Sequence, residues 1–497
     1  MRSSHAVMER ADVVVIGAGP TGLMLAGELR LGGADVIVLE RLTEPTGQSR
    51  GLGFTARTME VFDQRGILKG FGPGLETSPQ GHFGGLLFDY SVLEDAHFGV
   101  RGVPQCRTEE VLEEWAGALG ADVRRGWELT GLADRGDRAE VTARTQDGER
   151  RLCAAYVVGC DGGQSTVRAA AGFSFPGTEA RREMYLADVV GCSIRPRHLG
   201  ERLPGGMVMA APLGEGVDRV IVCPDGTPAS DRSRPPRFTD VAAAWLAITG
   251  EDISGGSAHW VSSFTDATRQ ITEYRRGRVL LAGDAAHIHL PAGGQGLSTG
   301  VQDAANLGWK LAATVQERAP EGLLDTYHDE RHRVGARLLM NTRTQGTLYI
   351  GGPETDSLRA LFGELIAYTD VRRHLAGAVS GLDIRYDVGG GEHPLLGRRL
   401  PPRRLRTAAG SVTTASLLHS AQGVLLDLGD DAGARATAAG WKDRVIAVSC
   451  ALADADADLG GSRALLVRPD GHIVWAAEDG TPLEDALHRW FGAPSAL

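Results

Sequence analysis

Three glycines open the segment whose residue types are best suited to binding a nucleotide. Gly17, Gly19 and Gly22 follow a β-branched run at residues 12–16 and precede apolar residues at helical spacing. At this spacing the first glycine permits a tight turn, the second lets backbone approach a pyrophosphate, and the third allows close helix–strand packing. Free N–H groups and the helix dipole at such a turn attract phosphate. The expected contacts are Gly17, Gly19, Pro20, Thr21 and Gly22.

Glu40 narrows the choice of nucleotide. It stands 18 positions after Gly22, where a second apolar run at residues 36–39 ends, and Arg41 follows it. A carboxylate at this place can accept hydrogen bonds from both ribose hydroxyls of an adenosine. It would repel a 2′-phosphate, so the resident nucleotide is expected to be FAD or NAD rather than NADP.

Two later segments bear on the choice between FAD and NAD. Asp161-Gly162 and Gly283-Asp284 each follow an expected strand, and both resemble motifs of flavoprotein hydroxylases, which favours FAD. Asp284 can then bind a ribityl hydroxyl. The turn at residues 291–298 directs backbone N–H groups and a helix N-terminus at the flavin, where they would stabilise negative charge at N1 and O2 of its reduced form. The expected contacts here are Asp161, Gly162, Asp284, Pro291, Gly294, Gln295, Gly296, Leu297 and Ser298.

These motifs, taken in order, resemble class A flavoprotein aromatic hydroxylases of the p-hydroxybenzoate hydroxylase fold, over about residues 10–380. Residues 49–60, 203–209 and 273–278 more narrowly resemble angucyclinone hydroxylases, which act in aromatic polyketide antibiotic pathways of actinobacteria. The resemblance implies that Arg50 lies beside the flavin and Gln105 near its ribityl chain. Ser298 departs from the family pattern, which usually has Asn there, so a side-chain amide contact to the flavin is in doubt.

The resemblance also implies the reaction. NAD(P)H reduces bound FAD, O₂ adds at flavin C4a, and the hydroperoxide delivers oxygen to an electron-rich phenolic ring. Because no second nucleotide fingerprint is present, NADPH is expected to visit transiently. The partner is then a small aromatic polyketide, and the enzyme must exclude water that would release hydrogen peroxide.

Acid–base candidates are few. Arg50 and His289 are the catalytic candidates, with His82 a further one, and each can equally be structural. His287 is interpreted as a loop anchor. Apolar residues of the strand-rich segment are plausible pocket walls and equally plausible core; they are Phe83, Phe88, Met207, Met209 and Trp260.

Other functions stay open. A Baeyer–Villiger oxygenase would share these motifs, and the sequence does not separate the two outcomes. A non-catalytic FAD-fold binder, like the Rab-escort-like binders of lipidated proteins, is disfavoured by the intact Glu40, Asp161 and Asp284. A flavin halogenase is disfavoured because it needs a tryptophan-rich motif and a catalytic lysine, and the chain has only Lys69, Lys310 and Lys442.

The elements that must position these residues indicate an α/β fold. We expect a discontinuous, Rossmann-like FAD-binding domain (GR2-type) at residues 1–172 and 275–385, with 75–105 contributing to a substrate sheet at 173–274. Helices are expected at 59–67, 109–119 and 299–316. The Gly- and Pro-rich linker near 389–406 leads to a thioredoxin-like domain at 386–497, whose lack of Cys-x-x-Cys excludes disulfide exchange.

Composition supports a multi-domain globular chain of 497 residues. The 52 Lys and Arg against 63 Asp and Glu give a net charge of −11, without a basic stripe, so nucleic acid is not expected as a partner. No apolar run is long enough to cross a bilayer and no signal peptide is visible. The six cysteines are widely spaced, as expected for reduced thiols in the cytoplasm. The sequence leaves a homodimer open.

Overall fold

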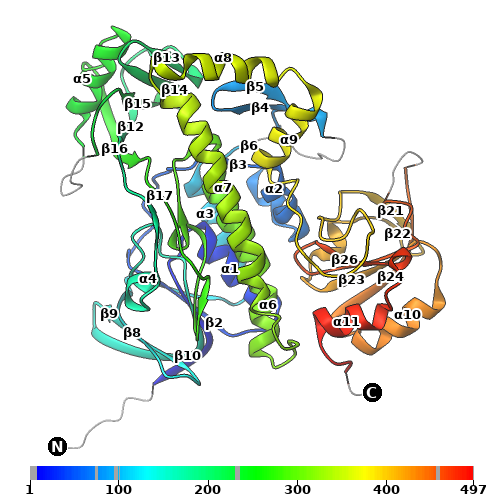
Figure 1. Cartoon of the computed structure of the whole chain (residues 1–497). Coiled ribbons are helices and arrows are strands. Elements are labelled where there is room, and N and C mark those ends of the chain that lie inside the picture. The colour runs from blue at the N-terminus through cyan, green and yellow to red at the C-terminus, as the bar shows by residue number, and fades with distance from the viewer. Residues whose placement is uncertain are drawn as a thin grey trace, which may run out of the picture.

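The computed structural model describes residues 8–72, 77–93, 99, 101–229, 236–454 and 459–495. Figure 1 shows three parts: a central body with long helices beside a sheet, a smaller sheet at one end, and a C-terminal unit at one side. These parts carry the candidate site between them.

The central sheet is the nucleotide-binding type that the glycine spacing predicts. Its strands run in the order β18-β19-β10-β1-β2-β7, and β9 and β8 continue from β10 as antiparallel neighbours. The pairs β1·β2, β1·β10, β2·β7 and β10·β19 are parallel. The bounds are β1 (Glu9–Ile16), β2 (Val36–Glu40), β7 (Asp122–Arg125), β8 (Glu128–Asp134), β9 (Ala139–Thr145), β10 (Gly148–Gly159), β18 (Arg275–Arg276) and β19 (Val279–Leu281).

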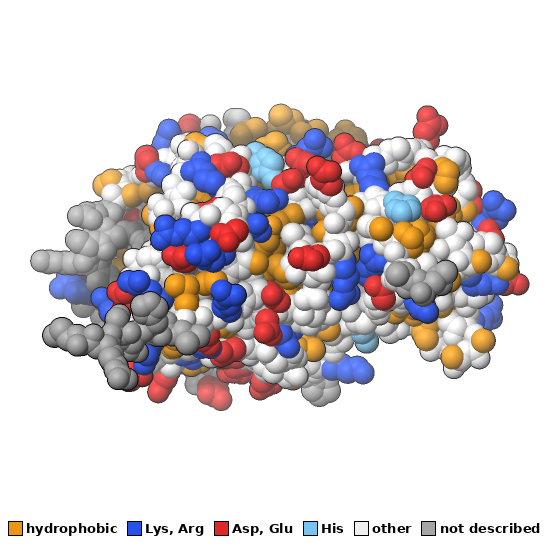
Figure 2. Space-filling view, turned by 90° about the horizontal axis from the view of Figure 1, so that it is seen from below, with side chains coloured by type: hydrophobic (Ala, Val, Ile, Leu, Met, Phe, Trp, Pro, Cys, Tyr) orange, Lys and Arg blue, Asp and Glu red, His pale blue; other side chains and the backbone are white. Residues whose placement is uncertain are grey.

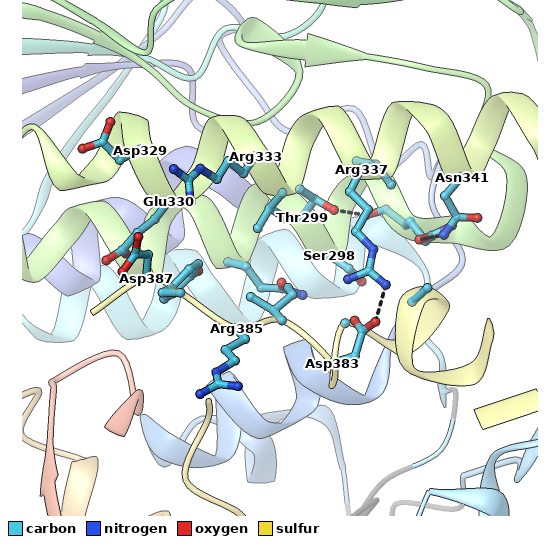
Figure 3. A pocket seen from close by; sticks show the side chains of 18 of the residues that line it. Ser298, Thr299, Asp329, Glu330, Arg333, Arg337, Asn341, Asp383, Arg385 and Asp387 are labelled. Carbon is cyan, nitrogen blue, oxygen red and sulfur yellow. Dashed lines mark hydrogen bonds and ion pairs between the residues drawn. The ribbon is translucent and has the colours of Figure 1, made fainter. Parts of the chain in front are cut away.

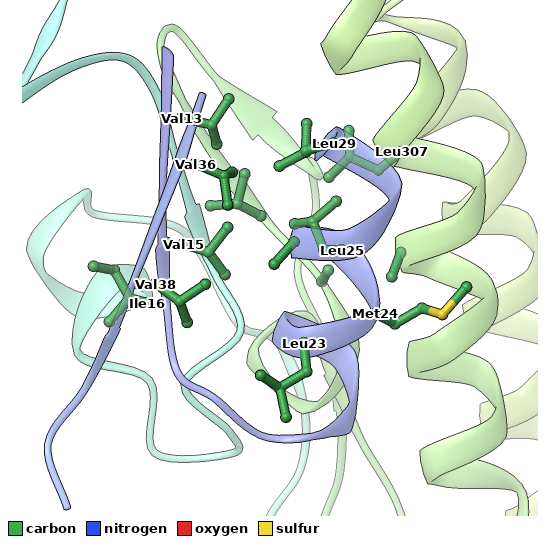
Figure 4. Close-up of a cluster of buried hydrophobic side chains, with 14 of the residues drawn as sticks. Val13, Val15, Ile16, Leu23, Met24, Leu25, Leu29, Val36, Val38 and Leu307 are labelled. Atoms are coloured by element: carbon green, nitrogen blue, oxygen red, sulfur yellow. The ribbon is translucent and has the colours of Figure 1, made fainter. Parts of the chain in front are cut away.

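Helices α1 (Pro20–Leu31) and α6 (Gln295–Val315) pack in series beside this sheet, with α3 (Gln105–Ala118) against α1. Figure 4 shows α1 between the valines of β1 and β2 and the side chain of Leu307 on α6. Val15 and Leu25 are fully buried there, and each such side chain contributes about 1.5–3 kcal/mol to stability. This core fixes the glycine turn between β1 and α1.

A five-stranded antiparallel sheet in the order β13-β14-β15-β12-β16 covers the other end of the site. Helix α5 (Phe238–Thr249) packs on one face, against Val208 and Val220, so the alternate residues Met207 and Met209 face the other way. The bounds are β12 (Glu183–Val190), β13 (Arg197–Leu203), β14 (Gly206–Gly214), β15 (Val217–Pro224) and β16 (Ser257–Thr265).

The prediction that residues 75–105 add to this sheet is not met by their described strands. β4 (Gln80–Phe83) and β5 (Leu86–Asp89) pair with each other, and β6 (Arg101–Gly102) pairs with β3 (Gly53–Phe54). The tight turn at Gly84 and Gly85, both at positive φ, closes the first pair as a separate hairpin. A separate three-stranded sheet joins β11 (Gly177–Thr178), β17 (Thr268–Gln270) and β20 (His287–Ile288).

The remaining helices connect these sheets. Figure 1 shows α7 (Thr326–Ile350) running the length of the central body toward α8 (Asp356–Leu365). The others are α2 (Ala56–Gln64), α4 (Thr166–Ala170) and α9 (Thr369–Ser380), with short 3₁₀ turns at Gly283–Ala285 and Ala292–Gly294.

The C-terminal unit has the thioredoxin-like arrangement that the sequence predicts. Its sheet runs β22-β21-β24-β23-β25-β26, with β23 and β24 parallel around α10 and the last two strands antiparallel. β25 and β26 form a hairpin, with Gly471 at φ +79 in its turn. The bounds are β21 (Arg404–Thr407), β22 (Gly410–Thr413), β23 (Gly423–Asp427), β24 (Val445–Leu452), β25 (Ala464–Val467), β26 (Ile473–Ala476), α10 (Ala432–Ala438) and α11 (Leu483–Phe491).

Three predicted helix boundaries differ from the structure. α6 begins at Gln295 rather than 299, because Gly296 takes helical backbone despite its low propensity. α3 begins at Gln105, directly after Pro104, rather than at 109. α2 spans Ala56–Gln64 rather than 59–67.

The surface carries mixed charge. On the face in Figure 2, Lys and Arg side chains alternate with Asp and Glu, and this face presents no broad field of positive charge. Among the described residues, no helix combines the length and apolar character needed to span a membrane. In the same part of the chain, His, Cys, Asp and Glu side chains form no cluster suited to a metal ion.

Candidate functional site

The glycine turn between β1 and α1 has the geometry of a pyrophosphate cradle. A Cβ placed on Gly17 would lie 2.5 Å from the Cys160 carbonyl oxygen, and one on Gly22 would lie 2.0 Å from the Gly17 carbonyl oxygen. A Cβ on Gly19 would meet nothing within 4 Å. The outer two glycines are therefore required by packing, while Gly19 borders open space from which a phosphate can approach its backbone.

Glu40 is held beside this turn. Its Oε2 accepts a hydrogen bond from the Ala18 N–H and its Oε1 accepts one from the Leu42 N–H, both at 2.9 Å. The side chain is half-buried, and each oxygen retains a lone pair for a ribose hydroxyl. Its neighbour Arg41 is exposed.

Asp161 presents an unused acceptor at the end of β10. Its Oδ2 accepts a hydrogen bond from the Val167 N–H at 3.1 Å, but its Oδ1 is buried without a partner among the described residues. Gly162 follows at φ +80, with open space where a Cβ would stand. A buried orphan acceptor is costly unless something donates to it, so this pair suits a ligand hydroxyl or a bound water.

The loop at residues 291–298, called the flavin loop from here on, enters α6 with free backbone donors. Gly293 and Gly294 have φ of +71 and +63, and no side chain caps the helix start. The first N–H groups of α6 therefore lack helical partners. Ser298 is buried and its hydroxyl accepts from the Thr55 N–H at 3.0 Å, so the side chain contacts protein.

Asp284 and His289 both lie close to Gly296 in the first turn of α6. A Cβ on Gly296 would lie 3.4 Å from His289 Nε2 and 4.0 Å from Asp284 Oδ1. Asp284 is exposed. On its other side α6 contacts the glycine turn, because a Cβ on Gly300 would lie 2.3 Å from Thr21 Oγ1. The first turns of α6 therefore contact both the Gly283-Asp284 motif and the glycine turn.

Gln105 and the Arg50 segment are also brought to the flavin loop. Gln105 Oε1 accepts from the Gly51 N–H at 3.2 Å, and its own N–H donates to the Gly51 carbonyl at 3.0 Å. A Cβ on Gly51 would lie 3.4 Å from Leu297 Cδ1. Arg50, next in the chain, is exposed. Arg50 therefore adjoins a residue that lies beside the flavin loop, and its side chain is open to solvent.

The histidines have distinct environments. His289 Nδ1 lies 2.7 Å from the Leu290 carbonyl oxygen, and burial lowers the pKa of its ring, so the ring is neutral near pH 7 and Nδ1–H donates. His287 is fully buried with Nε2 2.8 Å from Asp303 Oδ2, in agreement with the interpretation as a loop anchor. Burial also lowers the pKa of His82, which stands edge-on to Tyr349.

The apolar face of the five-stranded sheet meets the flavin loop. Leu290 and Ala292 form one cluster with Met207 of the sheet, and Met209 packs against it. Other members are Met184, Cys223 and Tyr349. Of the remaining predicted walls, Phe83 and Phe88 belong to a different core cluster, which includes Tyr90, Leu348 and Val379, while Trp260 covers Arg219 at 5.6 Å.

A cavity of about 460 Å³ lies along another face of α6. Gln295, Ser298 and Thr299 line it beside α7, and Arg489 and Trp490 of the C-terminal unit also line it. Figure 3 shows Arg337 and Asp383 facing each other in it, at 2.6 Å. The cavity therefore reaches the flavin loop from the C-terminal side.

Sequence reasoning missed a row of buried amides that supports the flavin loop. Asn341 Nδ2 donates to Gln295 Oε1 at 3.3 Å, and Gln345 Nε2 donates to Asn341 Oδ1 at 2.9 Å. Gln345 Oε1 in turn accepts from the Gly84 N–H. The available signal was two amides four residues apart on one helix face.

Comparisons with known proteins agree with this geometry. Residues 10–342 match the family described as FAD binding domain, and residues 393–494 match the family described as aromatic-ring hydroxylase, C-terminal. The Streptomyces rimosus 12-dehydrotetracycline 5-monooxygenase/anhydrotetracycline 6-monooxygenase is 46% identical over 98% of this chain and 100% of its own length. The structure of CabE, an aromatic hydroxylase from angucycline biosynthesis, has a TM-score of 0.95 at 61% identity, covering 98% of this chain and 100% of that one. BexE, studied for oxidation during BE-7585A biosynthesis, has a TM-score of 0.94 at 57% identity over the same shares.

Proposed function

Because the chain belongs to the family of FAD-binding aromatic-ring hydroxylases, we propose that it is an NADPH- and O₂-consuming monooxygenase that hydroxylates an angucyclinone-type aromatic polyketide. The relatives whose names mention tetracycline and angucycline chemistry support a polycyclic aromatic substrate. The matches cover nearly the whole chain, so both the nucleotide-binding body and the C-terminal unit are included.

One observation carries the proposal. The flavin loop lies between the nucleotide cradle and the apolar sheet face: Thr21 contacts α6 on one side, while Leu290 and Ala292 pack with Met207 on the other. A flat aromatic ring resting on that sheet face would therefore lie next to the flavin loop. Holding the aromatic ring and the flavin next to each other in a fixed orientation would supply much of the rate acceleration of an oxygen transfer.

The residues present fit FAD. The open space at Gly19, the orphan Asp161 Oδ1 and the uncapped start of α6 are features that a dinucleotide with a ribityl chain would use. When bound, FAD supplies the redox chemistry and the activation of O₂. The proposed holding residues are Gly17, Gly19, Pro20, Thr21, Gly22, Glu40, Arg41, Arg50, Gln105, Asp161, Gly162, Asp284, Pro291, Gly294, Gln295, Gly296, Leu297 and Ser298.

The chain's own groups would then orient and shield the reactants. The free N–H groups of α6 would hold negative charge at the pyrimidine edge of the flavin. The methionine face would exclude water from the ring. His289, whose low pKa leaves Nε2 an acceptor near pH 7, would take a phenolic proton, and exposed Arg50 would hold charge beside it. NADPH would approach transiently; the cytoplasmic location and the homodimer stay predictions.

The test is substrate-stimulated NADPH oxidation by the FAD-loaded protein. We expect an angular tetracyclic aromatic polyketide to accelerate NADPH consumption and to gain one oxygen atom, measured by mass spectrometry. A ring-expanded lactone would instead indicate Baeyer–Villiger oxidation. A protein that binds no flavin would indicate a non-catalytic binder and overturn the proposal.

A further inference from the structure

The turn between β25 and β26 is buried and charged, although hairpin turns normally lie at the surface. Arg468 is fully buried, and Asp470 and His472 are each 3% exposed. The turn inserts into the central body: Arg57 donates to the Asp470 carbonyl at 2.9 Å and Arg65 donates to the Pro469 carbonyl at 2.8 Å. The C-terminal unit is therefore anchored through this turn.

Residues of this turn contact two consecutive residues of α7, one directly and one through Tyr386. Arg468 donates from both Nη atoms to Glu330, at 2.6 and 2.9 Å. The His472 ring lies 4.3 Å from the Tyr386 ring, and the Tyr386 hydroxyl accepts from Arg331 Nη1 at 3.0 Å. Glu330 and Arg331 are consecutive, so one turn of α7 receives both.

Arg331 is linked by hydrogen bonds, through Asp303, to the loop that contains Asp284. Its Nε donates to Asp303 Oδ1 at 2.6 Å and its Nη2 donates to the Thr299 carbonyl at 3.3 Å. Asp303 Oδ2 accepts from the Gly283 N–H at 3.0 Å and lies 2.8 Å from His287 Nε2. The residues on both sides of Asp284 are thus bound to one carboxylate.

We propose that the C-terminal unit is a positioning element for FAD: its buried turn, through Tyr386 and Arg331, fixes Asp303 and thereby the backbone on which Asp284 and the flavin loop stand. This inference rests on the proposed function, since it requires Asp284 and the flavin loop to contact FAD. Tyr386 and Arg331 are positioning residues that do not touch the cofactor themselves.

Arg331 is sensitive to a small change because it is fully buried and its donors have few alternatives. Removing the Tyr386 hydroxyl leaves Nη1 without this acceptor while ring packing on His472 is kept. Arg331 then shifts toward another acceptor, and Asp303 moves with it. The loss of one hydrogen bond to a buried charge corresponds to about a tenfold change in an equilibrium constant.

The experiment compares Tyr386→Phe with Tyr90→Phe. Tyr90 is a buried phenol that packs with Phe83 and Phe88 in a separate cluster. FAD is titrated into each apoprotein, the midpoint potential of bound FAD is measured, and urea unfolding of the apoproteins reports stability. We expect Tyr386→Phe to raise the Kd for FAD about tenfold and to lower the midpoint potential, because misplaced N–H groups stabilise reduced flavin less. Tyr90→Phe is expected to change neither.

The outcomes separate the two proposals. If both variants lose stability but keep the wild-type Kd and potential, the C-terminal unit is only structural and the inference fails. If the wild-type protein itself binds no FAD, the proposed function fails. If Tyr386→Phe does not fold, Arg331→Lys is the second variant. It keeps a positive charge beside Asp303 but loses the branched guanidinium that donates to Asp303, Tyr386 and Thr299 at once. We expect it to change the Kd for FAD and the midpoint potential in the same directions.

Discussion

The carbonyl oxygen of Gly17 stands so close over Gly22 that a Cβ on Gly22 would lie 2.0 Å from it. Three residues before Gly22, Gly19 has φ −80 and open space in front of it. The same motif therefore contains one glycine required by folding and another required only by a ligand.

This difference predicts opposite effects of two alanine substitutions. Gly22→Ala should destabilise the apoprotein by about 3 kcal/mol, because backbone rather than a flexible side chain must move. Gly19→Ala should leave the urea midpoint unchanged and weaken FAD binding, since the methyl group occupies the path of the pyrophosphate. Equal FAD affinity in Gly19→Ala and wild type would contradict the cradle.

Asp284 is expected to bind the ribityl chain. Asp284→Asn should raise the Kd for FAD by roughly tenfold or more, because a hydrogen bond to a charged group contributes about 1.5–3 kcal/mol. Fluorescence titration of the apoprotein measures this. Glu321→Gln, which neutralises another exposed carboxylate, is the control and should leave the Kd unchanged. A fully loaded Asp284→Asn protein would refute the assigned role.

Neighbouring residues of β14 point to opposite faces and should separate substrate binding from stability. Met209→Ala enlarges the apolar face beside the flavin loop, so the KM for the polyketide should rise while FAD affinity is kept. Val208→Ala opens a cavity under α5 and should cost roughly 2 kcal/mol in unfolding without changing KM. Steady-state kinetics and urea unfolding of both variants measure these effects. An unchanged KM in Met209→Ala would show that Met209 does not line the substrate site.

The buried His472 ring should make the free energy of unfolding fall in acid. Burial lowers its pKa from 6.5 to about 4, although Asp470 opposes this shift and Arg57 and Arg468 add to it. Below pH 6.5 the unfolded chain binds a proton that the folded chain does not, so stability is complete above that pH and falls as pH drops toward 4. The loss between pH 7 and pH 5 is about 2 kcal/mol.

Urea unfolding at pH 7 and pH 5 measures this loss. His472→Gln has no ring to protonate, so its free energy of unfolding should change less over the same interval. An equal loss in both proteins would show that other groups cause the acid sensitivity.

The local pattern of the sequence correctly predicted the glycine turn between β1 and α1. Gly17, Gly22 and Glu40 are close in the chain, and the turn between strand and helix follows from steric rules alone. The start of α6 was placed four residues late because Gly293, Gly294 and Gly296 read as loop, whereas the first two supply left-handed turns and the third lies in the helix.

The contacts that the sequence did not reveal join distant residues. Arg331 and Asp303 are 28 positions apart, and Arg468 and Glu330 are 138 apart, so no local period marks them. The apolar wall shows the same limit: Phe83 and Met207 are both hydrophobic, but only tertiary packing places Met207 beside Leu290 and Phe83 in another cluster.

Oxygen transfer to the substrate is measured most directly in a single turnover of the FAD-loaded protein with NADPH and ¹⁸O₂ in the presence of an angular tetracyclic polyketide. We expect a product that carries one ¹⁸O atom on a ring carbon, with little hydrogen peroxide. Consumption of NADPH with all oxygen recovered as peroxide across such substrates, or no dependence of NADPH oxidation on the polyketide, would contradict it.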